Sequence, residues 1–386
     1  MHSRLQPFGP ALKSSSAALA MRETFGEICV PPLGACRSLL GFSAHEYFQR
    51  RECLMRPEEI TRALMKKSLL IVQCAWLLLI VGCAAPASAP TPVSETTVPG
   101  PTATSIPQSE PFPTAVKPDW LNVPYVPDGS SLQRLDVYLP ANGDGPFPTI
   151  LAIHGGGFRL LSKTLYSRLA GHLNELGYAV VPTDYRLTPG YSYPAQVEDV
   201  FCALAWIHAN HATHGFDNER IFVMGDSAGG YLAAMLGTID TPSAYLENCP
   251  YSLPASDWIQ GAVIFYGFYD FMSIDGYPRG EVIGYLHPYW GAQFSEIPPE
   301  TLAEMSPMSW VDGSEPPFLL IHGTLDTSVP SWMSEKFAAE LDDAGVDVEL
   351  LLVDAKHAFI LKPLSSPENV QSLAAIEAFL SACSEQ

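Results

Sequence analysis

One serine in this chain stands between two glycines, in a pattern that suits a nucleophile. Residues 222–234 read FVMGDSAGGYLAA, with Ser227 between Gly225 and Gly229. An apolar run precedes this G-x-S-x-G pattern and a helix-forming run follows it, which is the setting of a nucleophile elbow. A serine that only caps a helix needs no flanking glycines. We therefore predict that Ser227 is a nucleophile at a helix N-terminus, where negative charge is favoured.

A glycine-rich run upstream of this serine could stabilise that negative charge. His154, Gly155, Gly156 and Gly157 follow an apolar run typical of a buried strand. An isolated glycine triplet would indicate only a flexible loop, but here both order and position suit a site. We predict that the backbone N–H groups of Gly156, Gly157 and Ala228 form an oxyanion hole. We expect His154 to shape the loop rather than to transfer protons.

A nucleophilic serine needs a base, and the base needs an acid that orients it. Asp326 follows one expected strand and His357 follows the next, so the chain order is serine, acid, histidine, as in other nucleophile-elbow enzymes. Asp354 and Asp226 are alternative acids. Asp354 stands at a strand end, where its side chain could have only a local role in a turn. Asp226 adjoins the serine but is expected to point elsewhere. We predict that Asp326 and His357 complete a triad.

These residues predict acyl transfer without a metal or a cofactor. The histidine would accept the serine proton as the serine oxygen attacks an ester carbonyl, and water would later release the acyl group. A possible metal site consists of His208, His211 and His214, but we expect these histidines to be solvated at a helix end. No pair of cysteines has the spacing of metal ligands.

Apolar runs alternate with helical patterns through residues 119–386, with no internal repeat. The expected strands are 132–140, 147–157, 178–186, 220–226, 259–267, 317–323 and 347–357. The expected helices are 165–176, 194–215, one starting at Ser227, 331–345 and 368–383. The first strand reads as half-exposed and the helix 194–215 as amphipathic. This alternation predicts an α/β fold with a mostly parallel sheet and helices on both of its faces.

Several motifs together resemble one known family. HGGGF, DYRLTPGYSYPAQVEDV, GDSAGGYLAA, HGTLDTSVP and KHAF are similar to motifs of α/β-hydrolase esterases and lipases with an HGGG loop, the hormone-sensitive-lipase-like group. The resemblance covers about residues 119–386 and implies the α/β-hydrolase fold, a Ser-His-Asp triad and carboxylesterase activity. Gly190 and Tyr191 replace an acidic residue usual in that group. Asp326 precedes Thr-Ser-Val-Pro instead of forming a DPL motif, which is closer to the bacterial feruloyl and acetyl esterase-like branch.

We predict a small insert between residues 267 and 316, because little strand character occurs there. Aromatic residues are frequent in and beside it: Tyr266, Phe268, Tyr269, Phe271, Tyr277, Tyr285, Tyr289, Trp290 and Phe294. They could form the core of a small subdomain, or some could line the site and stack on a sugar or aryl group. A long groove for lipid chains would require more aliphatic residues in this insert. We therefore expect short-chain acyl or aryl esters as substrates, including acetyl or feruloyl groups on carbohydrates.

Two other functions compete with an esterase. A serine peptidase of the same fold is the first, although such peptidases usually carry an extra domain. A binding protein on an inactive hydrolase scaffold is the second, but such proteins typically lose the serine or the histidine. Binding of nucleic acid is not expected, because the net charge is -20 and no basic stripe could neutralise phosphates. The sequence favours no particular oligomeric state.

The charge is unevenly distributed and changes sign at an apolar segment. Residues 1–83 hold ten Lys and Arg against six Asp and Glu, whereas 84–386 hold eleven against 35. The segment 65–83, MKKSLLIVQCAWLLLIVGC, has two lysines, a short apolar run and a cysteine, and it resembles a bacterial lipoprotein signal peptide. That resemblance implies cleavage before Cys83 and attachment of lipid to its sulfur. We expect an extracytoplasmic protein, lipid-anchored to a bacterial cell envelope.

We expect no packed core in the regions on either side of this signal. Residues 84–118 are rich in Pro, Ser, Thr and Ala, which predicts an extended tether. Residues 1–64 precede a signal that should be N-terminal, so we predict that translation starts at Met65; native peptides from upstream of Met65 would contradict this. Among the remaining cysteines, we expect Cys202 to be a small core residue, and the sequence leaves a disulfide of Cys249 open.

Overall fold

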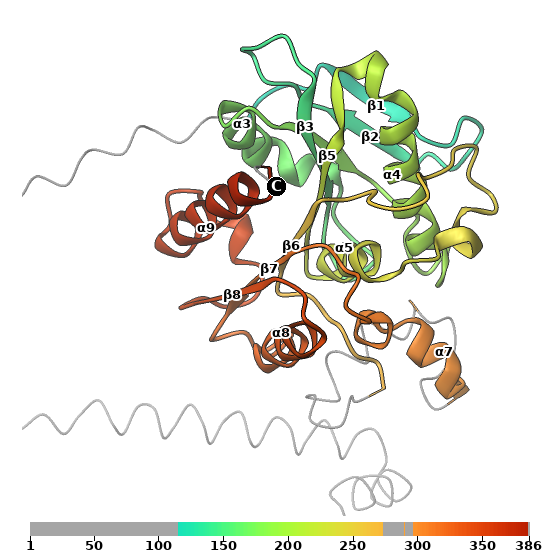
Figure 1. Cartoon of the computed structure of the whole chain (residues 1–386), viewed down its shortest axis with the longest axis vertical. Coiled ribbons are helices and arrows are strands. Elements are labelled where there is room, and N and C mark those ends of the chain that lie inside the picture. Colours follow the sequence, from blue (N-terminus) through green and yellow to red (C-terminus); the bar gives the residue numbers. More distant parts are fainter. Residues whose placement is uncertain (1–114, 273–288, 290–295, 385–386) are drawn as a thin grey trace, which may run out of the picture. The chain divides into compact units, whose positions relative to one another are not determined.

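The computed structural model describes residues 115–272, 289 and 296–384 (Figure 1). The chain divides into two units, Met1–Ala103 and Thr104–Gln386, and all described residues belong to the second. Cys83 and the expected signal peptide therefore lie outside the described residues, as do the extension 1–64 and most of the expected tether. Within the part that is described, no helix is long and apolar enough to span a membrane.

The described residues form one eight-stranded sheet with the strand order β1-β2-β4-β3-β5-β6-β7-β8. Its strands are β1 (Trp120–Pro124), β2 (Arg134–Val137), β3 (Phe147–Ile153), β4 (Ala179–Thr183), β5 (Phe216–Asp226), β6 (Gly261–Phe265), β7 (Phe318–Gly323) and β8 (Val348–Val353). β2 runs antiparallel to both of its neighbours, and every other neighbouring pair is parallel. The mostly parallel sheet is thus confirmed, while β1 was not predicted and β2 is shorter and more buried than expected.

Helices cover both faces of the sheet, as predicted. They are α3 (Ser167–Glu175), α4 (Ala195–His214), α5 (Ala228–Thr238), α8 (Trp332–Ala344) and α9 (Pro367–Ser384), with short α7 (Pro299–Glu304) in the insert. Short 3-10 helices are η1 (Lys163–Tyr166), η2 (Pro242–Leu246), η4 (Pro307–Trp310) and η5 (Phe359–Leu361). In Figure 1, α3 and α9 lie on one side of the strands and α4, α5 and α8 on the other.

Strand alternation divides the core into two apolar layers. In β3, Leu151 and Ile153 belong to the cluster that contains the buried side chains of α4, α5 and α8. Ile150 and Ala152 belong to the other cluster, together with the side chains of α3 and α9. Because successive side chains of a strand point to opposite faces, an unbroken apolar strand is needed to fill both layers.

The parallel arrangement brings four loops to one edge of the sheet. The carboxyl ends of β3, β5, β7 and β8 precede, respectively, the glycine loop 155–157, Ser227, Asp326 and His357. Ligands and reacting groups in open α/β sheets gather at this carboxyl edge. Residues more than 200 positions apart in the chain are therefore collected at one place.

Helix α4 differs from its predicted amphipathic character. It is buried on nearly all sides from Ala195 to His208, because it is covered both by the sheet and by later parts of the chain. His208 and His214 are 6% and 8% exposed, so the prediction that they are solvated at a helix end was wrong. The two ring nitrogens of His208 lie 2.9 Å from the Asn218 side chain and 2.9 Å from the Trp258 carbonyl oxygen.

A disulfide joins Cys202 to Cys249, 47 residues later. Cys202 is 3% exposed and belongs to the core, as predicted, but its disulfide was not predicted. Cys249 follows η2, and this short helix packs against α4, which brings the two Cα atoms to 5.5 Å. Sequence periodicity shows the helical position of Cys202 but not which distant segment lies beside it.

Five of the aromatic residues in and beside the insert are core residues. Tyr266, Tyr269, Phe271 and Tyr289 are fully buried, and Phe268 is 6% exposed. The prediction that insert aromatics pack into a core is supported for these residues. Four further aromatics lie outside the described residues: Tyr277, Tyr285, Trp290 and Phe294.

Candidate active site

Ser227 occupies a sharp turn between β5 and α5. Its backbone has φ 53° and ψ −116°, an unusual conformation for a residue with a side chain. The turn is tight enough to require glycine on both sides. A Cβ atom at Gly225 would lie 2.1 Å from the Gly229 carbonyl oxygen, and one at Gly229 would lie 2.0 Å from the Ile153 carbonyl oxygen. The two glycines around the serine are thus explained by backbone contacts.

Ser227, His357 and Asp326 form one hydrogen-bonded line. The Ser227 Oγ lies 2.9 Å from His357 Nε2. His357 Nδ1 lies 2.6 Å from Asp326 Oδ2. With the imidazole proton on Nδ1, that nitrogen donates to the carboxylate, and Nε2 accepts from the serine hydroxyl. This arrangement leaves a base in direct contact with the serine oxygen.

The carboxylate of Asp326 is buried and held on both oxygens. Its Oδ1 accepts hydrogen bonds from the backbone N–H groups of Ser328 and Val329 at 2.8 and 2.9 Å. Burial acts to raise the pKa of Asp326, but the hydrogen bonds from His322 and His357 outweigh it and hold the pKa below its usual range. The carboxylate therefore stays ionised beside the imidazole at neutral pH.

The two alternative acids have other surroundings. Asp354 is exposed, and it is Asp326 that contacts His357 Nδ1. Asp226 is buried under the glycine loop, where its Oδ1 accepts hydrogen bonds from the Gly155 N–H at 2.9 Å and from the Tyr166 hydroxyl at 3.0 Å. Burial raises the pKa of Asp226 to about 6. Asp226 thus links the serine turn to the glycine loop.

The glycine loop lies against the serine. Gly156 and Gly157 have φ of 102° and 59°, and together with Ala228 they line the same cavity as Ser227. His154 lies beneath the loop, 1% exposed, with its Nδ1 donating to the Gly155 carbonyl oxygen at 2.8 Å. Its ring stacks on Tyr185, and burial lowers the pKa of His154. A neutral, buried imidazole outside the cavity suits a role in shaping the loop.

The cavity in front of Ser227 has a volume of about 320 Å³. Phe158, Tyr231, Phe268 and Phe271 contribute aromatic walls, so some insert aromatics line the site as well as the core. Leu160 and Leu161 also line it and are 65% and 47% exposed. The cavity therefore offers an apolar wall and an open, apolar mouth to a ligand, next to a polar reacting centre.

Backbone strain concentrates around this cavity. Several other non-glycine residues near Ser227 also have a positive φ. They are Phe158 at 61°, Leu161 at 71°, Ala358 at 60° and Tyr266 at 38°. The first three line the cavity, and the ring of Tyr266 lies 4.7 Å from that of His357. Conformations of this kind cost about 1–3 kcal/mol each and tend to cluster at functional sites.

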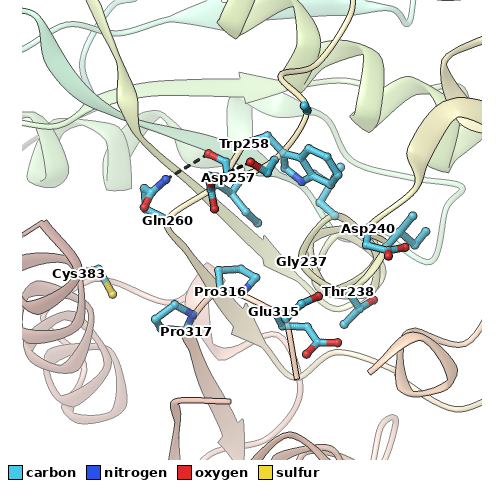
Figure 2. A pocket seen from close by; sticks show the side chains of 16 residues that line it. Gly237, Thr238, Asp240, Asp257, Trp258, Gln260, Glu315, Pro316, Pro317 and Cys383 are labelled. Carbon is cyan, nitrogen blue, oxygen red and sulfur yellow. Dashed lines mark hydrogen bonds between the residues drawn. The ribbon is translucent and has the colours of Figure 1, made fainter. Parts of the chain in front are cut away.

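A second cavity, of about 550 Å³, lies at the opposite edge of the sheet (Figure 2). It is bordered by the residues that precede β6 and β7 and by the end of α5. Figure 2 shows Trp258, Asp257 and Gln260 facing the segment of Glu315 and Pro316. No histidine lines it, and burial raises the pKa of the nearby Cys383 thiol to about 11. Asp240, Asp257 and Glu315 line it, but none of its lining hydroxyls is paired with a histidine, so the smaller cavity is the better candidate for chemistry.

Sequence reasoning missed three kinds of group that hold either the acid loop or Asp226 beside the serine. These are the amides of Ser328 and Val329, the Tyr166 hydroxyl, and the imidazole of His322. A signal existed only for His322, which stands four residues before Asp326 in the motif HGTLD. As for metals, the described residues hold no cluster of three or more potential ligands from His, Cys, Asp and Glu.

Solved structures of esterases share this architecture. Esterase B of Lactobacillus rhamnosis aligns with a TM-score of 0.61 and 24% identity, over 72% of this chain and 90% of that chain. A truncated form of a carbohydrate esterase from gut microbiota aligns with a TM-score of 0.58 and 23% identity, over 69% of this chain and 96% of that chain. The chain therefore has the α/β-hydrolase fold, as the motifs predicted.

Within that fold class, the family is BD-FAE. The family matches residues 135–341, more than half of the chain, and the chain belongs to it. A curated relative, esterase LipQ of Mycobacterium tuberculosis, is 31% identical over 249 residues. The match covers 62% of this chain, and the chain spans only 57% of the length of LipQ.

Proposed function

We propose that this protein is a carboxylic-ester hydrolase in which Ser227, His357 and Asp326 act as nucleophile, base and orienting acid. The observation that carries the proposal is the hydrogen-bonded line Ser227–His357–Asp326, with contacts of 2.9 and 2.6 Å. Its serine opens into an apolar cavity beside the glycine loop. Membership of the BD-FAE family and similarity to an esterase, LipQ, support the same chemistry.

In the first half of the reaction, His357 Nε2 takes the proton of Ser227 while the serine oxygen bonds to the ester carbonyl carbon. The carbonyl oxygen becomes an oxyanion, for which the N–H groups of Gly156, Gly157 and Ala228 are the proposed donors. The ionised Asp326 stabilises the imidazolium. His357 then gives its proton to the leaving alcohol as the ester C–O bond breaks, and the acyl group remains on the serine.

In the second half, water replaces the alcohol. His357 takes a proton from water as the water oxygen attacks the acyl carbon, and it returns that proton to Ser227 when the acyl–enzyme bond breaks. The product is a carboxylic acid. In each half His357 accepts one proton and passes it on, first from Ser227 to the alcohol and then from water to Ser227.

Short-chain acyl or aryl esters are the proposed substrates. Tyr231, Phe268 and Phe271 form aromatic walls of a cavity of only about 320 Å³, and these walls could stack on an aryl or sugar ring. All three side chains are buried and packed against other aromatics, which makes the walls rigid. The proposed substrates include acetyl or feruloyl esters of carbohydrates. One solved structure with the same fold is a carbohydrate esterase.

A series of p-nitrophenyl esters tests the proposed substrate range. From acetate to palmitate, we expect kcat/KM to be highest for acetate or butyrate and to fall at least about 10-fold for palmitate, because a rigid wall excludes long chains at a cost of 1.4 kcal/mol or more. Steady-state hydrolysis of each ester is the measurement. A maximum at palmitate would overturn the short-chain proposal. Cleavage of peptide p-nitroanilides without any ester hydrolysis would favour a peptidase instead.

We also propose that the protein is extracytoplasmic and anchored by lipid at Cys83. The lipoprotein-like segment 65–83 supports this proposal. The disulfide Cys202–Cys249 supports an oxidising compartment, because such bonds are rare in the cytosol. The acidic chain that follows the segment fits a domain exposed to soluble or polymeric substrates.

Replacing Cys83 by serine tests the anchor. In a bacterial host that processes lipoproteins, we expect the wild-type protein to be labelled by radioactive palmitate and to fractionate with membranes, and C83S to lose the label. The matched control is C383S, since Cys383 is the free cysteine of the described residues and should not affect labelling. Equal labelling of C83S and wild type would contradict the anchor.

A further inference from the structure

We propose that His322 is a positioning residue for the catalytic acid: it fixes the loop 326–329 and tunes the charge that Asp326 presents to His357. This inference rests on the proposed function, since it concerns the acid of that triad. His322 belongs to β7, four residues before Asp326, and its side chain is fully buried. His322 begins the HGTLDTSVP motif, but the proton transfers of the reaction do not require a second histidine there.

The imidazole of His322 is held at both nitrogens. Its Nε2 lies 2.8 Å from the Val329 carbonyl oxygen. Its Nδ1 lies 2.7 Å from the Ser334 hydroxyl, which in turn lies 3.1 Å from the Tyr269 hydroxyl. Ser334 and Tyr269 are fully buried too. Each of these polar groups therefore has only protein partners in the described part of the chain.

The chemistry of these partners sets the direction of every hydrogen bond. A carbonyl oxygen can only accept, so Nε2 of His322 carries the proton and donates to Val329. In the neutral imidazole Nδ1 then accepts, and the Ser334 hydroxyl must donate to it. The hydroxyl of Tyr269 donates to Ser334 in turn. This order fixes one tautomer and one orientation of the His322 ring.

The hydrogen bond from His322 to the Val329 carbonyl acts on the loop that holds Asp326. The N–H groups of Ser328 and Val329 donate to Asp326 Oδ1, and the Val329 carbonyl is the group that His322 holds. The same Nε2–H lies 3.5 Å from Asp326 Oδ2, the oxygen that contacts His357 at 2.6 Å. His322 therefore acts on Asp326 in two ways. Its hydrogen bond to Val329 holds the loop, and the positive end of its N–H dipole lies near the carboxylate.

The expected consequence has a definite sign. The Nε2–H dipole of His322 offsets part of the negative charge on Asp326. Without it, the carboxylate favours the protonated form of His357 more strongly, so the acid limb of kcat/KM moves to higher pH. The other titratable groups facing this pair are Asp226 and Tyr266, and both are unchanged in the variants below.

Two substitutions separate the proposal from a merely structural role. In H322Q the amide nitrogen can occupy the position of Nε2 and keep a donor toward Val329 and Asp326. In H322N the shorter amide can reach Ser334 but not the acid loop. We expect H322N to lower kcat by about 10- to 100-fold with little change in KM, because Asp326 keeps its contact with His357 but the loosened acid loop aligns the imidazole less well with Ser227. We expect its acid limb to rise by about half a pH unit, and H322Q to restore most of kcat and the wild-type limb.

The measurement is the pH profile of kcat and kcat/KM for p-nitrophenyl acetate, with circular dichroism and thermal unfolding as checks on folding. A loss of kcat in both variants without a shift of the acid limb would overturn the proposal, as would wild-type kinetics in H322N. If H322N does not fold, S334A replaces it. Without the Ser334 hydroxyl, the His322 ring is no longer held in one tautomer, and we expect a smaller rise of the acid limb of kcat/KM. A wild-type protein inactive on all esters would instead refute the proposed function.

Discussion

Replacing Ser227 by alanine is expected to lower kcat for p-nitrophenyl acetate by about 10⁴- to 10⁶-fold. The substitution removes the hydroxyl oxygen that is proposed to bond to the acyl carbon and that lies 2.9 Å from His357 Nε2. Ser227 is the partly exposed N-cap of α5 and makes no side-chain cap hydrogen bond, and alanine leaves Gly225 and Gly229 in place, so the fold should persist. The residual rate would come from the oxyanion donors and substrate binding alone.

Two further results bear on this prediction. A fluorophosphonate probe should label the wild-type protein once, on Ser227, and should not label S227A. Ser328 lines the same cavity but contacts Asp326 only through its backbone N–H. S328A therefore serves as the matched control and should retain most of the activity. Full activity of S227A would move the nucleophile elsewhere.

Replacing Asp326 by asparagine should lower kcat by about 10⁴-fold near neutral pH. The asparagine amide can donate a hydrogen bond to His357 Nδ1, which would force the imidazole proton onto Nε2. That tautomer cannot accept the proton of Ser227. Asp354 provides the matched control, because it is close to His357 in sequence but exposed. If D354N rather than D326N lost the activity, the assignment of the acid would be wrong.

The same variant has a predictable effect on stability. The pKa of Asp326 is depressed in the folded protein, since hydrogen bonds from His322 and His357 outweigh the effect of burial. A carboxylate of this kind stabilises the fold above its unfolded pKa, about 3.9, and the contribution is lost as pH falls through the folded value. D326N should therefore lower Tm at pH 7, and the difference from wild type should narrow at pH 3. An equal difference at both pH values would point to a packing defect.

These predictions concern one site because the α/β-hydrolase fold concentrates its loops at the carboxyl edge of the sheet. The larger cavity lies at the opposite edge and lacks a histidine. Volume alone would therefore have selected the opposite edge of the sheet. What distinguishes the smaller cavity is the combination of a strained serine turn, a held imidazole and a buried carboxylate.

Much of the fold could be predicted because its determinants are local. The apolar runs of β3, β5, β6 and β7 and the helical patterns between them indicate a parallel sheet with two covered faces, since strands buried on both faces must be apolar throughout. The residues Gly225 and Gly229 likewise reveal a turn that rejects a Cβ atom. β1 was missed because its exposed residues, WLNVP, carry little apolar alternation.

The sequence by itself thus determined the fold class and three candidate residues, Ser227, Asp326 and His357, because each stands where a strand ends. Only the tertiary structure decided which distant groups meet them. The pairing of Cys202 with Cys249, the burial of His208, and the contact of His322 with the acid loop depend on long-range packing. Such contacts leave no local period in a chain, because the partner of a side chain is set by how the layers stack and not by its neighbours in sequence.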